Sequence, residues 1–341
     1  MSLAHALPAG PTPADIFSTL NAHQQSAALR GAIELDLFTG IAEGHASAEA
    51  LAAYCRADAR ATRILCDYLT VYGYLTKTGE NYELPPTVSM FLVRTSPQYM
   101  GSIARFINSP PLLEAFDDVA ELVRRGSTLL GEEGTTETEY DGWVEFARSM
   151  VPVMMPCAEF MAELAEQRFK GPTRVLDVAA GHGMFGLSIA RRLPEAAVTA
   201  VDWENVLAVA HENAQALGFH DRYNLQPGDA FAVDFGENYD LVLLTNFLHH
   251  FDQPRCVNLM RKVVGALSPD GTVMTLEFIP NEDRVTPPAS ATFSFMMLGT
   301  TPAGDAYTRS EYETMWNEAG LTSHEMLDVP NSPQRVMVSR R

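Results

Sequence analysis

The chain has 341 residues, more than a single hydrophobic core usually serves, so we expect two domains. Its 24 Lys and Arg residues against 43 Asp and Glu residues give a formal net charge of -19, and such a surface repels the phosphates of nucleic acids. No apolar run approaches the ~20 residues of a membrane span, no signal-peptide pattern opens the chain, and the four cysteines form no CxxC pair. These features predict a cytoplasmic protein, in a reducing compartment, that binds neither nucleic acid nor membrane.

Residues 13–100 are predicted to form the first domain, which is mainly helical. From Pro13 to about Leu92, apolar residues recur at the spacing of short helices. Asp58 has a side chain that can cap the start of a helix, and Gly73 is suited to the end of the same helix.

A small hairpin follows this helix, with strands at residues 74–77 and 81–84 and Gly79 in the turn. Three helices followed by a hairpin indicate a winged helix. The helix that would read DNA in such a fold, residues 59–72, has two arginines as its only basic residues. We therefore expect a dimerisation domain, with a ligand-responsive DNA-binding regulator as the alternative.

Residues 101–165 are predicted to form a helical linker. Within this linker, residues 126–142 are rich in Gly, Thr and Glu, a composition typical of exposed loops. We expect this stretch to be an exposed connection between the domains.

Residues 166–341 are predicted to form an α/β domain. Short apolar strands alternate with helical segments here, as a parallel sheet with crossover helices requires. The candidate parallel strands are residues 175–178, 198–201, 241–245 and 272–278. Near the end of the chain, residues 322–329 and 335–339 are separated by a turn with two prolines, which indicates a terminal antiparallel hairpin.

A glycine-rich turn follows the first of these strands. The glycines Gly181, Gly183 and Gly186 allow a ligand to lie against bare backbone, and their spacing also matches the dinucleotide-binding fingerprint. Asp202 ends the next strand, where a carboxylate can accept hydrogen bonds from both ribose hydroxyls of an adenosine. A nicotinamide dinucleotide and S-adenosylmethionine both satisfy this pattern.

Asp177, four residues before the first glycine, favours S-adenosylmethionine. An acid at this position can anchor the amino group of a methionine moiety, whereas a pyrophosphate would gain nothing from it. Asp229 follows the third strand of the domain and can accept a hydrogen bond from an adenine amino group.

The segments VLDVAAGHG, AVDW, GDAF and LTNFLHHFD resemble, in this order, the motifs of small-molecule O-methyltransferases. The group that they resemble joins plant caffeic-acid-type and bacterial acetylserotonin-type enzymes. The resemblance implies a class I methyltransferase domain, Rossmann-like, with a mostly parallel seven-stranded sheet that ends in an antiparallel hairpin. It also implies an N-terminal winged-helix dimerisation domain, a homodimer, S-adenosylmethionine as cofactor with S-adenosylhomocysteine as product, and no metal.

The resemblance also implies a set of cofactor-binding residues. Many members have glycine where this chain has Ala179, and we expect an extended backbone there, which tolerates the alanine methyl group. The predicted cofactor-binding residues are Met150, Asp177, Ala179, Gly181, Gly183, Asp202, Trp203, Asp229, Ala230, Phe231 and Asn246.

The catalytic histidine of the family falls on His249, and the first of the two glutamates that orient it in plant members falls on Glu277. Histidine suits the removal of a hydroxyl proton, because its ordinary pKa lies near neutrality. The second glutamate falls on Ala306, so His249 has lost one orienting partner, and Asp305 is the residue that can substitute.

By the same resemblance, the acceptor pocket uses Phe146, Met150, Met154, His250, Phe293, Met296 and Met297. We therefore predict methyl transfer from S-adenosylmethionine to a hydroxyl of an aromatic or polyketide-like small molecule. Ala306 leaves C-methylation or a cofactor-retaining hydroxylation open. A nicotinamide-dependent oxidoreductase is the alternative from another class.

Overall fold

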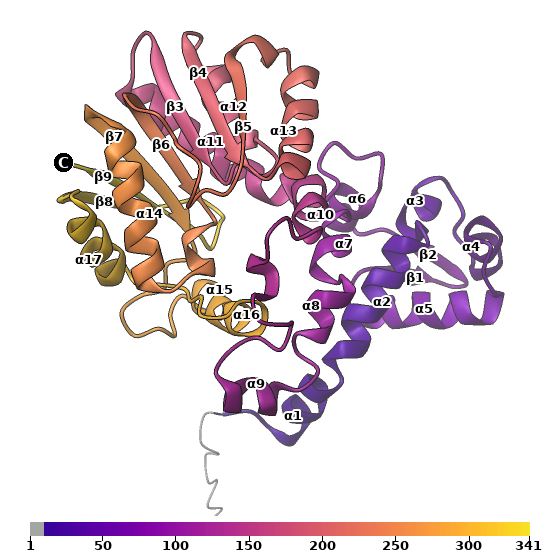
Figure 1. Cartoon of the computed structure of the whole chain (residues 1–341). Coiled ribbons are helices and arrows are strands. Elements are labelled where there is room, and N and C mark those ends of the chain that lie inside the picture. The colour runs from indigo at the N-terminus through magenta and orange to yellow at the C-terminus, as the bar shows by residue number, and fades with distance from the viewer. Residues whose placement is uncertain (1–9) are drawn as a thin grey trace, which may run out of the picture. The chain divides into compact units, whose positions relative to one another are not determined.

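The computed structural model describes residues 10–341 and divides the chain into two compact units (Figure 1). The first unit ends at Ala104, and the second runs from Arg105 to Arg341. Within the described residues, no helix has the length and apolar character needed to cross a membrane. All four cysteines are free thiols.

The first unit consists of helices and one hairpin, as predicted. The side chain of Asp58 accepts a hydrogen bond from the N–H of Ala61 and so caps the helix, and Gly73 follows its end with a φ of 78°. The hairpin is shorter than predicted at both strands. The elements are α1 (Pro13–Leu20), α2 (Ala22–Glu34), α3 (Leu37–Ala42), α4 (Ala48–Cys55), α5 (Ala59–Val71), β1 (Thr76–Thr78), β2 (Asn81–Glu83) and α6 (Pro86–Leu92).

The second unit contains a seven-stranded sheet with the strand order β5-β4-β3-β6-β7-β9-β8. The strands are β3 (Thr173–Val178), β4 (Ala196–Asp202), β5 (Tyr223–Pro227), β6 (Tyr239–Thr245), β7 (Leu267–Glu277), β8 (Ser323–Asp328) and β9 (Arg335–Arg340). Strands β3 to β7 are parallel, whereas β9 is antiparallel to both of its neighbours, which confirms the predicted fold and terminal hairpin. The chain moves to opposite sides of β3 at β4 and β6, so the carboxyl ends of these three strands form one edge where a ligand can bind.

Helices cover the sheet. Helices α11, α12 and α13 pack beside one another, and α14 packs against α17 (Figure 1). The helices before the sheet are α7 (Ile103–Ile107), α8 (Pro110–Glu114), α9 (Val119–Arg125), η1 (Gly134–Thr136), α10 (Gly142–Ser149) and α11 (Val151–Arg168). The later ones are α12 (Met184–Arg192), α13 (Glu204–Ala216), η2 (His220–Arg222), η3 (Leu248–His250), α14 (Gln253–Ala266), α15 (Pro288–Ala291), α16 (Phe293–Thr300) and α17 (Arg309–Ala319).

The stretch of residues 126–142 does not connect the two units, contrary to the prediction. It lies inside the second unit, where the hydroxyl of Thr128 donates to the carbonyl of Gly299 at 2.7 Å and that of Thr135 donates to the carbonyl of Thr300 at 3.1 Å. Both threonines are buried. Their hydroxyls satisfy carbonyl groups at the end of α16, so these two threonines make tertiary contacts within the second unit, although other residues of the stretch are exposed.

Candidate active site

The glycine-rich turn joins β3 to α12 in a left-handed backbone conformation. Ala179, Gly181 and Gly183 have φ values of 56°, 58° and 75°. The expectation of an extended backbone at Ala179 is therefore wrong. A Cβ atom added at Gly181 would meet no heavy atom within 4 Å, whereas one at Gly183 would lie 2.5 Å from the hydroxyl of Tyr223. The backbone at Gly181 therefore faces open space in which a ligand can approach it.

Asp177 supports this turn from inside the protein. Its side chain is fully buried, and its Oδ2 accepts the backbone N–H of Gly186 at 3.0 Å. Within residues 10–341, Oδ1 has no hydrogen-bond partner, and neither does the buried hydroxyl of Tyr223. Burial raises the pKa of Asp177 to about 7. One carboxylate oxygen is thus used by the turn, and the other remains free.

Asp202 lies at the carboxyl end of β4, directly beside the glycine-rich turn. Its Oδ2 accepts the N–H of Gly181 and its Oδ1 accepts the N–H of Trp203, both at 2.8 Å. The side chain is partly buried, and burial raises its pKa to about 6. Each oxygen retains a lone pair that can accept a ribose hydroxyl. The open backbone at Gly181 and the carboxylate of Asp202 together fit an adenosine cofactor.

The remaining predicted adenosine contacts extend from the same strand ends. The N–H of Gly228 donates to the carbonyl of Asp202 at 2.9 Å, which brings the loop after β5 next to Asp202. In that loop, Asp229 accepts the N–H of Phe231 through Oδ1 at 2.9 Å, and Ala230 is buried.

Two of the aromatic residues in this set also pack against protein. The Phe231 ring packs edge-on against Phe251 with 4.8 Å between ring centroids. Trp203 packs with Trp143 and Val144 against a small buried cluster between α10 and α13. Both aromatic rings therefore have structural partners in addition to any ligand.

Asn246 follows β6 and connects it to two distant segments. Its φ is 54°, its Nδ2 donates to the sulfur of Met154 at 3.6 Å, and its Oδ1 accepts a short hydrogen bond from Gln334. Met150 is buried at the junction of α10 and α11. Gln334 was not found from the sequence, because no motif marks it and the contact spans 88 residues.

His249 and Glu277 form a buried pair, as the resemblance implies. Glu277 is fully buried at the end of β7, and its Oε1 accepts the N–H groups of Phe247 at 3.0 Å and Leu248 at 2.9 Å. Its Oε2 forms a short hydrogen bond with Nδ1 of His249. Among the described residues, Nε2 of His249 has no hydrogen-bond partner. The carboxylate thus fixes both the loop and one edge of the imidazole, and the other edge is available.

His250 lies next to His249 and is also buried. The two ring centroids are 4.3 Å apart, and the ring of Trp143 packs edge-on against His250 at 5.1 Å. Within the described residues, Nδ1 of His250 has no partner. Burial, with a smaller contribution from His249, lowers the pKa of His250 well below its ordinary value, so this imidazole is neutral.

Aromatic side chains gather around the histidines. Phe293 packs edge-on against His249 with 4.8 Å between ring centroids. Phe146 lies 5.1 Å from Phe106 and 5.7 Å from Trp143. Phe106 and Trp143 are not among the site residues predicted from the sequence. The spacing of Trp143 and Phe146, three apart on α10, was the available signal.

Three of the four predicted methionines of the acceptor set occupy two helices. Met154 is buried on α11, whereas Met296 and Met297 follow Phe293 on α16.

Ala306 is fully buried, and Asp305 does not replace the missing carboxylate. The N–H of Asp305 donates to the carbonyl of His249 at 3.0 Å, so this segment does run along the histidine. The carboxylate of Asp305, however, pairs with Arg284 at 3.1 Å and accepts the N–H of Ala306 at 2.8 Å. Glu277 is therefore the carboxylate that holds the His249 ring among the described residues.

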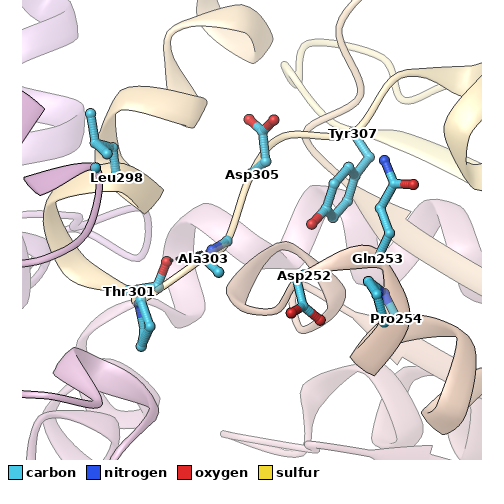
Figure 2. A pocket seen from close by; sticks show the side chains of 11 residues that line it. Asp252, Gln253, Pro254, Leu298, Thr301, Ala303, Asp305 and Tyr307 are labelled. Carbon is cyan, nitrogen blue, oxygen red and sulfur yellow. Dashed lines mark hydrogen bonds between the residues drawn. The ribbon is translucent and has the colours of Figure 1, made fainter.

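The segment that contains Asp305 lines part of a cavity of about 510 Å³ (Figure 2). Its lining includes Asp252, Gln253, Thr301, Asp305 and Tyr307, and it shares no residue with the predicted cofactor or acceptor sets. Within residues 10–341, no group of three or more His, Cys, Asp or Glu side chains is arranged to hold a metal ion.

Comparisons with known proteins agree with this geometry. The sequence model of the O-methyltransferase domain family matches residues 134–322. The sequence model of the O-methyltransferase dimerisation domain family matches residues 17–94. The 3-hydroxy-5-methyl-1-naphthoate 3-O-methyltransferase of Streptomyces sahachiroi is 27% identical over 304 residues, or 86% of this chain and 85% of that protein.

Solved structures share the fold over nearly the whole chain. The crystal structure of a candidate O-methyltransferase from Nostoc punctiforme PCC 73102 is 44% identical, with a TM-score of 0.94, and the match covers 97% of this chain and 100% of that one. Human N-acetylserotonin methyltransferase in complex with S-adenosylmethionine is 22% identical, with a TM-score of 0.83 and coverages of 98% and 99%, which shows the likeness of the fold.

The first family model alone covers more than half of the chain. This match excludes the alternative of a nicotinamide-dependent oxidoreductase, although the glycine spacing is compatible with one. The chain belongs to the family of S-adenosylmethionine-dependent O-methyltransferases.

Proposed function

We propose that this protein transfers a methyl group from S-adenosylmethionine to a hydroxyl of an aromatic or polyketide-like small molecule, with His249 as the general base. The observation that carries the proposal is the buried pair of His249 and Glu277 beside the carboxyl ends of the parallel strands. The relative from Streptomyces sahachiroi acts on a hydroxynaphthoate, which is an acceptor of this class.

The pairing with Glu277 defines what His249 can do. A carboxylate that accepts from Nδ1 selects the tautomer with the proton on that nitrogen, so Nε2 presents a lone pair. Nε2 is then the atom that takes the proton of the acceptor hydroxyl. General-base assistance of this kind typically contributes ~10²–10⁴ to a rate.

The cofactor supplies an electrophilic methyl group when it is bound. We assign its ribose to Asp202 and the backbone at Gly181, because Asp202 offers acceptors and Gly181 faces open space. Gly183 joins this assignment from the resemblance. Positioning two reactants in line supplies much of the rate enhancement in such a reaction. The other residues assigned to the cofactor are Met150, Asp177, Ala179, Trp203, Asp229, Ala230, Phe231 and Asn246.

The acceptor site is assigned to residues of α10, α11 and α16 and to His250. Aromatic rings and methionines form an apolar, polarizable lining that suits a planar ligand. Phe106 and Trp143 belong to the same aromatic group and join this assignment. The residues taken from the resemblance are Phe146, Met150, Met154, His250, Phe293, Met296 and Met297.

A homodimer formed through a winged-helix first unit is part of the proposal. The match to the dimerisation domain supports it, and so do the exposed apolar side chains of α1, where Ile16, Phe17 and Leu20 are 52%, 71% and 73% exposed. Light scattering of the purified protein measures its mass in solution. A monomer at micromolar concentration would contradict this part.

A second candidate reaction keeps the cofactor but changes the product. Ala306 provides no second carboxylate, and Asp305 is turned to Arg284, which makes the support of His249 weaker than in plant members. This difference favours testing for C-methylation or a cofactor-retaining hydroxylation beside O-methylation. The structure of the product distinguishes the three.

His249→Ala tests the main proposal. We expect kcat to fall by ~10²–10⁴ while the Kd for S-adenosylhomocysteine, measured by calorimetry, stays unchanged. His220→Ala is the matched control, because His220 is an exposed histidine of η2 and belongs to none of the predicted sets. Full activity of His249→Ala would remove this residue from the mechanism.

A further inference from the structure

Five aromatic rings follow one another through the candidate site, with His249 in the middle. Phe278 stacks on Phe293 at 3.9 Å and 13°, and Phe293 meets His249 at 4.8 Å and 79°. His250 also lies 4.3 Å from His249, and Trp143 packs against His250 at 5.1 Å and 72°. Two rings therefore contact His249, and each of them has a further ring packed against it.

One segment, residues 126–143, connects Trp143 to the helix that carries Phe293. The indole N–H of Trp143 donates to the carbonyl of Thr135 at 3.0 Å. The hydroxyl of Thr135 in turn donates to the carbonyl of Thr300, at the end of the helix that carries Phe293. Through these two hydrogen bonds the segment connects α10 to α16. The proposed reaction does not use Thr128 and Thr135, the buried threonines of this segment. In this arrangement they attach the segment to α16.

A single carboxylate leaves the imidazole of His249 free to tilt. Glu277 holds only Nδ1, and one hydrogen bond does not prevent rotation of the ring about that contact. The second carboxylate is absent at Ala306, and Asp305 faces Arg284. Rings packed against an imidazole oppose such rotation, because any tilt must displace them or open a void.

We propose that Trp143 and Phe293 are positioning residues for His249, and that their ring packing takes the place of the second carboxylate. This proposal rests on the proposed function of His249 as base. Trp143 acts through His250, and Phe293 acts directly on His249. Trp143 is half-buried on α10 and has no counterpart among the residues implied by the family resemblance.

The test uses Trp143→Leu and Phe293→Leu, singly and together, in the full-length protein. Each single variant is expected to lower kcat, at saturating acceptor, by about threefold to tenfold, the range that one aromatic pair supports. The Kd for S-adenosylhomocysteine is expected to stay unchanged. Trp143→Phe and Phe293→Tyr, which keep a ring, are expected to restore most of kcat. Phe295→Leu is the control, because Phe295 lies on the same helix and is 47% exposed.

A second readout does not depend on turnover. The ring nitrogens of His249, followed by ¹⁵N NMR, are expected to give one sharp set of signals in the original protein and broadened or multiple signals in the double variant. If the leucine variants do not fold, Phe278→Leu removes only the ring behind Phe293 and is expected to broaden the same signals.

The outcomes separate this proposal from the function on which it rests. Unchanged kcat and unchanged His249 signals in the double variant would overturn the positioning role. Activity that survives His249→Ala would instead overturn the proposed base, whatever the NMR signals show.

Discussion

Replacing Glu277 with glutamine changes the charge and one atom of the buried carboxyl group and keeps its shape. The orientation of the new amide follows from its surroundings. Oε1 receives the N–H groups of Phe247 and Leu248, so the amide oxygen must remain there. The NH₂ group then faces Nδ1 of His249 and donates to it, which moves the histidine proton to Nε2. The imidazole retains its place but loses the lone pair that accepts the proton of the acceptor hydroxyl.

The expected loss in kcat is ~10²–10⁴, because a general base is removed by imposing the wrong tautomer. The Kd for S-adenosylhomocysteine and the melting temperature should change little. Glu277→Ala is the contrasting variant, since it leaves two buried backbone N–H groups unpaired at about 1–3 kcal/mol each. It should therefore lose both stability and activity.

Turnover of Glu277→Gln is measured as S-adenosylhomocysteine released with an accepted substrate, and ¹⁵N NMR reports the tautomer of His249. A variant that keeps the original kcat, with the proton of His249 on Nε2, would refute the reasoning. It would show that Nε2 does not accept the proton.

Three further predictions concern the cofactor side of the site. Asp177→Asn should stabilise the cofactor-free protein near pH 8 more than near pH 5, by ~2–3 kcal/mol in urea denaturation. The sign follows from burial, which raises the pKa of Asp177 from 3.8 to about 7. Between those pH values the unfolded chain releases a proton that the native state retains, so the stability of the original protein falls as the pH rises. Asp202→Asn should raise the Kd for S-adenosylhomocysteine by ~10–100-fold, since a charged acceptor is worth about 1.5–3 kcal/mol. The original protein should itself bind more weakly as the pH falls through about 6, where Asp202 takes up a proton. Ala179→Val should destabilise the protein by about 1–2 kcal/mol or more, because a β-branched residue is strained at a φ of 56°, whereas Ala179→Gly should not.

Each of these predictions has a contradicting result. Equal effects of Asp177→Asn at both pH values would show that the carboxyl is not held protonated by burial. Unaltered affinity in Asp202→Asn would place the ribose elsewhere, and a valine that is tolerated at position 179 would show that the turn is not strained there.

Local sequence patterns were sufficient to predict the strand and the helix that flank the glycine-rich turn. The apolar run before Gly181 predicts β3, and a turn rich in glycine at its end predicts the start of α12. The helix cap at Asp58 was also predicted correctly, because capping depends on a backbone N–H only three residues away. By contrast, a strand was expected before Asp229 but its residues were not assigned, because β5 is an edge strand in which only Tyr223 is buried and no apolar run marks it.

Features that depend on distant contacts were not predictable from one sequence. The composition of residues 126–142 is that of a loop, and only the carbonyls of α16, about 170 residues away, make its threonines buried partners. The ring of Trp143 meets His250 from 107 residues away in the chain (250 − 143). At Ala179 the expected extended backbone was wrong, because the turn geometry overrides the preference of alanine for negative φ.

The most direct test of the account is mass spectrometry of products formed from hydroxylated aromatic compounds and methyl-deuterated S-adenosylmethionine, with fragmentation to locate the label. We predict a product that carries the trideuteromethyl group on oxygen and that His249→Ala fails to form. A label on carbon, or an oxygenated product without label, would contradict the proposed O-methyl transfer.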